Sequence, residues 1–255
     1  SSAAYISSAY NENLSWETSE QTDFGLDLLM FKKKLNVTAD YFWKKTYDLI
    51  KQQDTEWTNT YGVGAPLINQ GEISNQGFEF AATWSDKAGE FTYDFGLNFA
   101  TLKNEVTYID ENPDSYWSHD ENWRYSLYPF RSKVGEPYYS YWLVQTDGIF
   151  GTEAEVTAHS KDGKKIQPNA KPGDLRFVDE NNDGKIDDKD RIFMGNAFPK
   201  ITYGFSANLA WKNWDMSLFF QGVGGVKLFH AFKESTLNAS EQGYNRWNKI
   251  LNAWS

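Results

Sequence analysis

A run of acidic and amide residues, DENNDGKIDDKD from Asp179 to Asp190, has the residue types and spacing of a calcium-binding loop. Calcium takes about six to eight oxygen ligands, and alternate positions of a tightly turning loop supply them. Gly184 stands where such a loop turns most sharply and needs a positive φ. The predicted ligands are Asp179, Asn181, Asp183, the backbone carbonyl of Lys185, Asp187 and Asp190. The sequence therefore predicts one structural Ca²⁺, which offsets carboxylate repulsion and orders the loop.

The last position of this loop departs from the usual pattern, because Asp190 stands where a glutamate is expected. The shorter aspartate reaches less easily to a bidentate contact, so the segment resembles single-loop calcium motifs of the dockerin kind more than a paired EF-hand. The alternative interpretation is an acidic turn, in which Asn182, Asp183 and Gly184 simply make a tight connection.

A second group of candidate residues is aromatic. Tyr108 to Trp142 contains eleven aromatic residues in 35 positions. Tyr and Trp rings can stack on the C–H face of a sugar or anchor a protein partner. The candidates for contact with cargo or a partner are Tyr116, Trp117, Trp123 and Tyr125. The alternative is that these rings pack a long loop against itself.

Other kinds of chemistry find little support in the sequence. There is no cysteine, and the three histidines, His119, His159 and His230, match no zinc-binding spacing. No nucleophile, metalloprotease or phosphate-loop motif is present, and no carboxylate pair stands out, so we expect no enzyme. The net charge of −10 and the lack of basic clusters argue against nucleic acid as a partner, since Lys32 to Lys34 resembles a short solvated turn.

The elements that must carry these residues are strands, because apolar and polar residues alternate with period two along several segments. This pattern is clear in Leu35 to Lys45, Phe78 to Trp84, Phe91 to Ala100, Phe205 to Trp211 and Trp214 to Gln221. Phe42 and Phe219 are the exceptions to it. We expect the apolar face to include Val37, Tyr41, Phe95, Leu97, Leu209 and Leu218, and the polar face to include Asn36, Asp94, Asn98 and Asp215.

Three features favour a membrane barrel over a soluble sandwich. The segments have about 9 to 11 residues, the length of a tilted strand that crosses a bilayer. Aromatic residues such as Trp84, Phe91, Trp211 and Trp214 flank the short connections, as in an interfacial belt. Short turns alternate with long excursions, about 46–76 and 102–199. The predicted fold is all-β, an antiparallel transmembrane β-barrel, and the open ends favour an arc of a larger barrel.

Several segments resemble SusC/RagA-type TonB-dependent outer-membrane receptors. They are NLSWETSEQTDFGLDL, KLNVTADYFWKKTYDLI, NQGEISNQGFEF, KPGDLRFVDENNDGKIDDKDRIFMGNAFPKITYGF and WDMSLFFQGVGG, in the expected order between Asn13 and Gly225. Together these matches are specific, whereas each alone is moderate.

The resemblance implies a barrel of about 22 strands in the bacterial outer membrane, of which residues 1–255 are an internal part. It also implies a plug domain outside this chain, energy from the TonB complex, and a SusD-like surface lipoprotein that helps capture a glycan or peptide. The alternative interpretation of the chain is a soluble, calcium-stabilised carbohydrate-binding or adhesion module. Strand parity leaves two placements for the acidic loop, an entirely extracellular excursion or one that contains two further membrane crossings.

Overall fold

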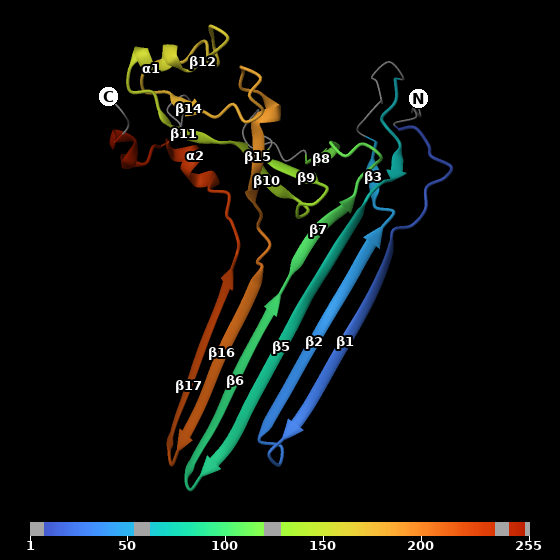
Figure 1. Cartoon of the computed structure of the whole chain (residues 1–255). Coiled ribbons are helices and arrows are strands. Elements are labelled where there is room, and N and C mark those ends of the chain that lie inside the picture. The colour runs from blue at the N-terminus through green and yellow to red at the C-terminus, as the bar shows by residue number, and fades with distance from the viewer. Residues whose placement is uncertain (1–7, 54–61, 120–128, 238–244, 253–255) are drawn as a thin grey trace, which may run out of the picture. The chain divides into compact units, whose positions relative to one another are not determined.

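The structure is a computed structural model, and it describes residues 8–53, 62–119, 129–237 and 245–252. The chain forms two compact units. The first contains residues 1–119, 131–139 and 197–226, and the second contains residues 120–130, 140–196 and 227–255. Most of the first unit is one sheet of long strands, whereas the second consists of short strands, turns and helices (Figure 1).

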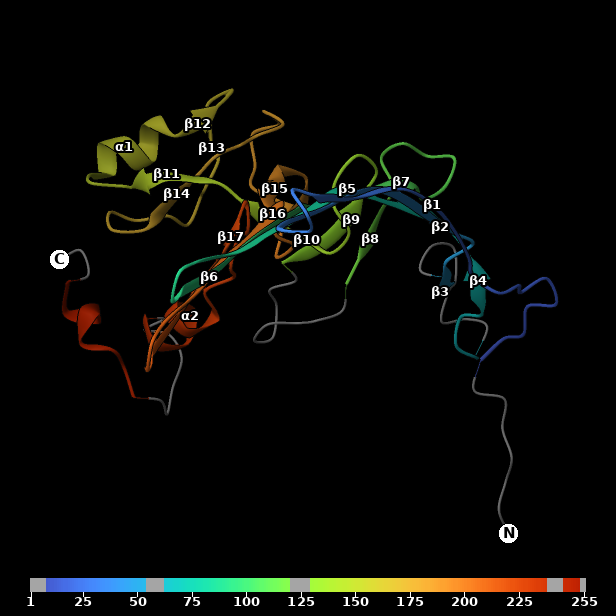
Figure 2. The same ribbon diagram turned by 90° about the horizontal axis from the view of Figure 1, so that it is seen from below.

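The large sheet of the first unit is antiparallel, with the strand order β1-β2-β5-β6-β16-β17. The six strands of this path are β1 (Thr18–Met30), β2 (Leu35–Tyr47), β5 (Glu72–Ala88), β6 (Phe91–Thr101), β16 (Ile201–Trp211) and β17 (Trp214–Gly224). A seventh strand, β7 (Lys103–Tyr108), pairs with β5 off this path. Viewed from the end of the short turns, the strands form one open layer (Figure 2). This arrangement confirms the antiparallel all-β prediction and the alternating segments on which it rested.

The register of the sheet separates its residues into two faces. One row that crosses all six strands is apolar: Leu28, Val37, Ala82, Leu97, Phe205 and Phe220. The next row, one residue along, is mostly polar: Asp27, Thr38, Ala81, Asn98, Gly204 and Gln221. Successive residues of a strand point to opposite faces, so the two rows belong to opposite sides of the sheet. The predicted division into an apolar and a polar face is confirmed.

Phe42, one of the two exceptions to the alternation, lies on the polar face opposite Gly77. A Cβ atom at Gly77 would come within 2.8 Å of the Phe42 ring, so the ring covers the glycine backbone. Pairing a large residue with glycine on the neighbouring strand fills the space that glycine leaves. A ring on this face is therefore compatible with an unbroken ladder.

Shorter elements extend the first unit beyond the long-loop end of the sheet. The strands β3 (Ile50–Gln52) and β4 (Leu67–Asn69) pair with each other, β7 (Lys103–Tyr108) continues along β5, and β8 (Tyr116–Ser118) pairs with β9 (Phe130–Lys133). Val106, Ile109 and Trp117 form a buried cluster here, with Leu49 and Ile73 packed against it. These apolar side chains give the long loops a core of their own.

The second unit has a small core around Phe150 and Val156, both fully buried. Its strands pair as β10 (Ser140–Val144) with β15 (Arg191–Gly195), β11 (Thr146–Ile149) with β14 (Leu175–Phe177), and β12 (Ser160–Lys161) with β13 (Lys164–Lys165). Its helical segments are α1 (Glu153–Ala158), η2 (Asp188–Asp190), α2 (Ala231–Leu237) and η3 (Asn248–Asn252). No helix in the described part of the chain is long and apolar enough to cross a membrane.

One detail differs from the sequence prediction, and a second decides between two alternatives that the sequence left open. Three strands exceed the expected length of about 9 to 11 residues. β1 and β2 contain 13 residues each and β5 contains 17, whereas β6, β16 and β17 contain 11 each. β5 is the longest, since its first residues pair with β7 after β6 has ended. In addition, β16 pairs directly with β6, and every described strand between them has six residues or fewer. The chain therefore leaves and re-enters the sheet at the same end, without two further crossings among the described strands.

The two faces predict opposite responses to a buried charge. Leu97 lies on the apolar face and Asn98 on the polar face. In the intact barrel, Leu97→Arg should lower the free energy of unfolding by about 2 to 4 kcal/mol, whereas Asn98→Arg should cost much less, because lipid penalises an arginine near the bilayer midplane. Reversible unfolding in lipid vesicles measures both variants. Equal losses at the two positions would contradict the assignment of the apolar face to lipid.

Candidate functional site

The acidic loop lies between β14 and β15, and its own side chains hold the first half of its turn. The Asp179 carboxylate accepts hydrogen bonds from the backbone N–H groups of Asp183 (3.0 Å) and Gly184 (2.8 Å). The side-chain oxygen of Asn181 accepts a second bond from the Asp183 N–H, at 2.9 Å. Gly184 has φ +90°, the left-handed conformation predicted for this position. The first half of the loop therefore turns where the sequence predicts.

Asp190 organises the second half of the loop. Its fully buried carboxylate accepts hydrogen bonds from the backbone N–H groups of Glu180 (3.0 Å) and Asp187 (2.7 Å), which ties the two ends of the loop together. Asp187 caps η2 by accepting a bond from the Lys189 N–H at 2.8 Å. When a buried carboxylate accepts hydrogen bonds from several N–H groups, these donors compensate its negative charge. Asp190 therefore closes the loop.

Lys185 supplies positive charge to this loop. Its ammonium group contacts the Asp187 carboxylate and lies 3.7 Å from Asp183. The same ammonium lowers the pKa of Asp187 and, in return, the Asp187 carboxylate raises the pKa of Lys185. Because the pKa of Asp187 is lowered and that of Lys185 is raised, the ion pair is intact at neutral pH, and on the acid side it is lost as the pH falls through the lowered pKa of Asp187.

The donor atoms of the loop are carboxylate, amide and carbonyl oxygens, which suit a hard divalent cation. Among the described residues, however, no three His, Asp or Glu side chains converge closely enough to hold a metal ion. A Ca²⁺ ion would have to displace the Lys185 ammonium from Asp183 and Asp187 and draw these carboxylates together. The calcium site therefore stays a prediction that the loop's chemistry supports.

The aromatic candidates divide into two classes. Trp117 is only 3% exposed and belongs to the core formed with Val106 and Ile109, so its ring packs the loop, as in the alternative interpretation. Tyr116 is 42% exposed, and the Arg131 guanidinium lies 4.4 Å from the centre of its ring. Trp123 and Tyr125 lie outside the described residues. Of the two described rings, only Tyr116 is exposed.

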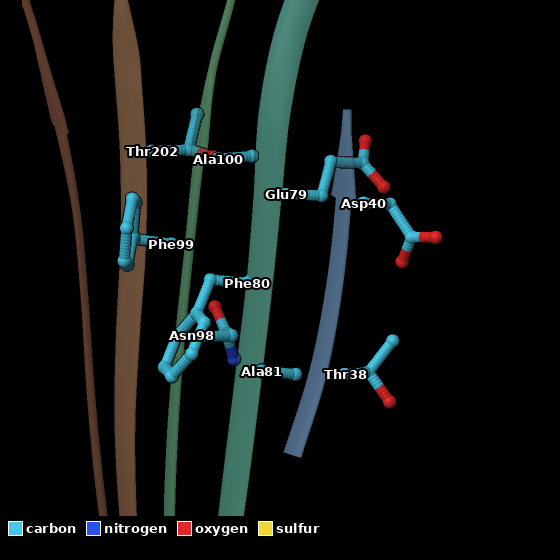
Figure 3. Close-up of a pocket in the computed structure, with 9 residues that line it drawn as sticks. All are labelled: Thr38, Asp40, Glu79, Phe80, Ala81, Asn98, Phe99, Ala100 and Thr202. Carbon is cyan, nitrogen blue, oxygen red and sulfur yellow. The ribbon is translucent and has the colours of Figure 1, made fainter. Parts of the chain in front are cut away.

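A third region is a hollow on the polar face of the large sheet. Its lining residues on this face are Thr38, Asp40, Glu79, Ala81, Asn98, Ala100 and Thr202. Phe80 and Phe99, which alternate with them along β5 and β6, also border it. Asp40 and Glu79 are register partners on β2 and β5, and Figure 3 shows their carboxylates next to each other. Ala81 pairs with Asn98, and their side chains lie on the same face. The small side chains of Ala81 and Ala100 leave the hollow open between carboxylate and amide groups.

Sequence reasoning missed this hollow as a unit. Alternation places Asp40 and Asn98 on polar faces, but it cannot show which residues of different strands are neighbours. The pairing of Asp40 with Glu79 depends on the β2–β5 register, and these strands are joined by a connection that includes β3 and β4. No local pattern in the sequence gives the register of strands connected in this way.

Comparison with known proteins shows which family has this architecture. Residues 1–248 match the family model described as TonB dependent receptor-like, beta-barrel. The chain belongs to this family. The TonB-dependent receptor P3 of Formosa agariphila is 31% identical over 249 residues, which cover 96% of this chain and 24% of the relative. The TonB-dependent receptor SusC of Bacteroides thetaiotaomicron is 23% identical over 92% of this chain and 22% of its own length.

A solved structure of the RagAB peptide transporter has the same fold. It aligns with a TM-score of 0.70 over 98% of this chain and 26% of that chain, at 19% sequence identity. Together with the family match, this confirms the resemblance to SusC/RagA-type TonB-dependent receptors and the interpretation of the sheet as part of a larger barrel. The chain spans 24% of the length of the P3 relative, so it corresponds to part of a TonB-dependent receptor.

The acidic loop of this TonB-dependent receptor is expected to respond to calcium. Ca²⁺ at millimolar concentration should protect the segment 179–190 from proteolysis, because the ion cross-links its carboxylates. Asp183→Ala should abolish this protection without unfolding the barrel, whereas Asp188→Ala, which changes a position outside the predicted ligand set, should retain it. Limited proteolysis with and without a chelator measures the effect. Identical cleavage rates with and without Ca²⁺ in the unchanged receptor would exclude the site.

Proposed function

We propose that the full-length receptor containing this chain imports oligosaccharides or peptides across the bacterial outer membrane, with energy from the TonB complex. The observation that carries this proposal is the match of nearly the whole chain to the TonB-dependent receptor barrel family. A SusD-like surface lipoprotein would capture the cargo, and a plug domain outside this chain would receive the TonB signal. The chain itself supplies part of the barrel wall and no catalytic step.

The two-faced sheet supports a position in the membrane. Large apolar side chains on the apolar face are exposed, among them Phe24 at 72% and Tyr203 at 52%. A sheet that exposes so many apolar groups is stable where lipid replaces water on that face. The opposite face carries Asp40, Glu79 and Asn98, which belong in water or against polar groups. A soluble carbohydrate-binding or adhesion module does not account for the apolar face.

The chemistry of the polar face suits polar oligomers. Carboxylates accept hydrogen bonds from sugar hydroxyls and from peptide N–H groups, and the Asn98 amide can both donate and accept. These groups face an open hollow rather than a closed pocket, which fits a passage better than a tight binding site. RagAB, whose fold matches, is described as a peptide transporter, and this supports peptides as one of the two cargo classes.

Calcium has a structural role in this proposal. The acidic loop belongs to the second unit, which has a small core and many turns. A Ca²⁺ ion held by Asp179, Asn181, Asp183, the Lys185 carbonyl, Asp187 and Asp190 would order the loop without taking part in transport.

If TonB drives transport, uptake of cargo should depend on both the receptor and TonB. A strain that expresses the full-length receptor should take up fluorescently labelled oligosaccharides or peptides from a mixed panel, and deletion of either the receptor or TonB should abolish that uptake. Complementation with the receptor restores it and serves as the control. Uptake that persists without TonB would overturn the mechanism, because passive diffusion through a pore needs no energy source.

The partner is proposed from the aromatic outer loops. Tyr108 and Tyr116 are 43% and 42% exposed in a chain whose loops are rich in rings. Exposed Tyr and Trp residues are enriched at protein interfaces, where the ring is buried while the hydroxyl or indole nitrogen still finds a hydrogen-bond partner. A lipoprotein that covers the long-loop end would bury these rings.

Truncation of one such ring tests the partner. Tyr116→Ala should reduce co-purification of the surface lipoprotein with the receptor, since loss of an aromatic anchor costs about 2 kcal/mol or more of binding free energy. Phe91→Ala, at the opposite end of the sheet, is the matched control and should leave the yield unchanged. Undiminished co-purification of the Tyr116→Ala receptor would place the contact elsewhere.

A further inference from the structure

The three short turns of the large sheet lie at one end of it and form one surface. They connect β1 to β2, β5 to β6, and β16 to β17 (Figure 1). Interactions link them to their neighbours: the Ser85 N–H donates to the Lys34 carbonyl at 2.8 Å, and the Lys212 ammonium lies 3.8 Å from Glu90. We call this surface the turn rim; it contains residues 31–34, 86–90 and 212–213.

Aromatic rings border the turn rim on the apolar face. Phe91, Trp211 and Trp214 are register partners on three adjacent strands and occupy the last row before the turns. Trp211 is 52% exposed and Trp214 is 77% exposed. Large amphipathic rings at this level are typical of the boundary between hydrocarbon and headgroups. The turn rim therefore lies at the depth of the lipid headgroups once the apolar face is in lipid.

The charge of the turn rim is opposite to that of the chain. The rim carries the five lysines Lys32, Lys33, Lys34, Lys87 and Lys212 against the two carboxylates of Asp86 and Glu90, although the whole chain has a net charge of −10. A protein that is acidic overall but basic at one edge has a local field that attracts anions there. This contrast distinguishes the rim from an ordinary solvated turn.

Only part of this positive charge is neutralised within the rim. Lys34 pairs with Asp86 at 2.7 Å, and Lys212 lies 5.0 Å from the centre of the Trp211 ring, near Glu90. Lys32, Lys33 and Lys87 are exposed, and no ion pair joins them to another residue in the part of the chain that the structure describes. Three ammonium groups are thus available to phosphate.

We propose that the turn rim binds the phosphate groups of anionic phospholipids in the adjoining leaflet, through Lys32, Lys33 and Lys87. The aromatic row fixes the depth of the rim, and the long lysine side chains place their ammonium groups at the phosphates. This inference rests on the proposed position of the sheet in a membrane, but it concerns neither cargo nor TonB. It gives the receptor a lipid preference that is set at its short-turn end.

The test measures lipid binding to the full-length receptor in vesicles. Spin-labelled phosphatidylglycerol and phosphatidylcholine are compared at low salt by the fraction of each lipid that the protein immobilises. The unchanged receptor should favour phosphatidylglycerol by about fivefold or more, the effect of a single lysine engaged at a membrane surface. The variant Lys32→Gln/Lys33→Gln/Lys87→Gln should lose most of this preference, and Lys32→Arg/Lys33→Arg/Lys87→Arg should keep it.

A matched control removes three exposed lysines outside the rim, in Lys164→Gln/Lys171→Gln/Lys233→Gln, and it should retain the preference. The proposal is overturned if the unchanged receptor shows no preference, if the triple glutamine variant of the rim keeps it, or if the control loses it equally. Insertion into vesicles is checked first by heat-modifiable gel mobility. Failure to insert would overturn both this inference and the proposed membrane position, whereas inserted protein without lipid preference would overturn this inference alone.

Discussion

The backbone hydrogen-bond ladder of the large sheet is the constraint on which the other features depend. Lipid offers no hydrogen bonds to peptide groups, so strands that cross it must pair along their whole length. Pairing also fixes the register, and a shift of one residue would exchange the two faces of the sheet. The row from Leu28 to Phe220 and the row from Asp27 to Gln221 keep their character over six strands because every pairing preserves it.

The ladder explains where polar groups can be placed at low cost. Asp40 and Glu79, carboxylates in register on neighbouring strands, lie on the face opposite the apolar row that contains Leu97 and Phe205. The acidic loop of the second unit differs from the sheet, because its backbone N–H groups have no strand partner as hydrogen-bond acceptor. There the carboxylates of Asp179 and Asp190 accept hydrogen bonds from backbone N–H groups that would otherwise donate to a strand partner. Carboxylates in this chain therefore occupy the polar face of the sheet and, in the acidic loop, accept backbone hydrogen bonds.

Much of the fold could be predicted from local patterns. Alternation at Leu35 to Lys45 and at Phe91 to Ala100 gave strands and their faces, because period two is a property of single strands. The loop at Asp179 to Asp190 was located by spacing, and Gly184 has the predicted positive φ. The sequence left open whether Trp117 packs the loop or contacts cargo or a partner, because burial against Val106 and Ile109 depends on contacts between separate loops. The Asp40–Glu79 pair was missed for the same reason, since register across a long connection leaves no local trace.

The direct pairing of β6 with β16 has a consequence for the order in which the sheet forms. Their junction is closed by the Leu102 N–H, which donates to the Lys200 carbonyl at 3.0 Å, while β16 and β17 are joined only by Lys212 and Asn213. The entropic cost of closing a loop rises by about 0.6 kcal/mol of free energy for each doubling of its length. Closing the connection between β6 and β16 therefore costs roughly 3 to 4 kcal/mol more than closing the β16–β17 turn. The β16–β17 hairpin is therefore expected to form early and to join the edge of β6 late, after the intervening segment has folded. A strand edge left unpaired during that interval is the part of the nascent sheet most in need of protection from aggregation.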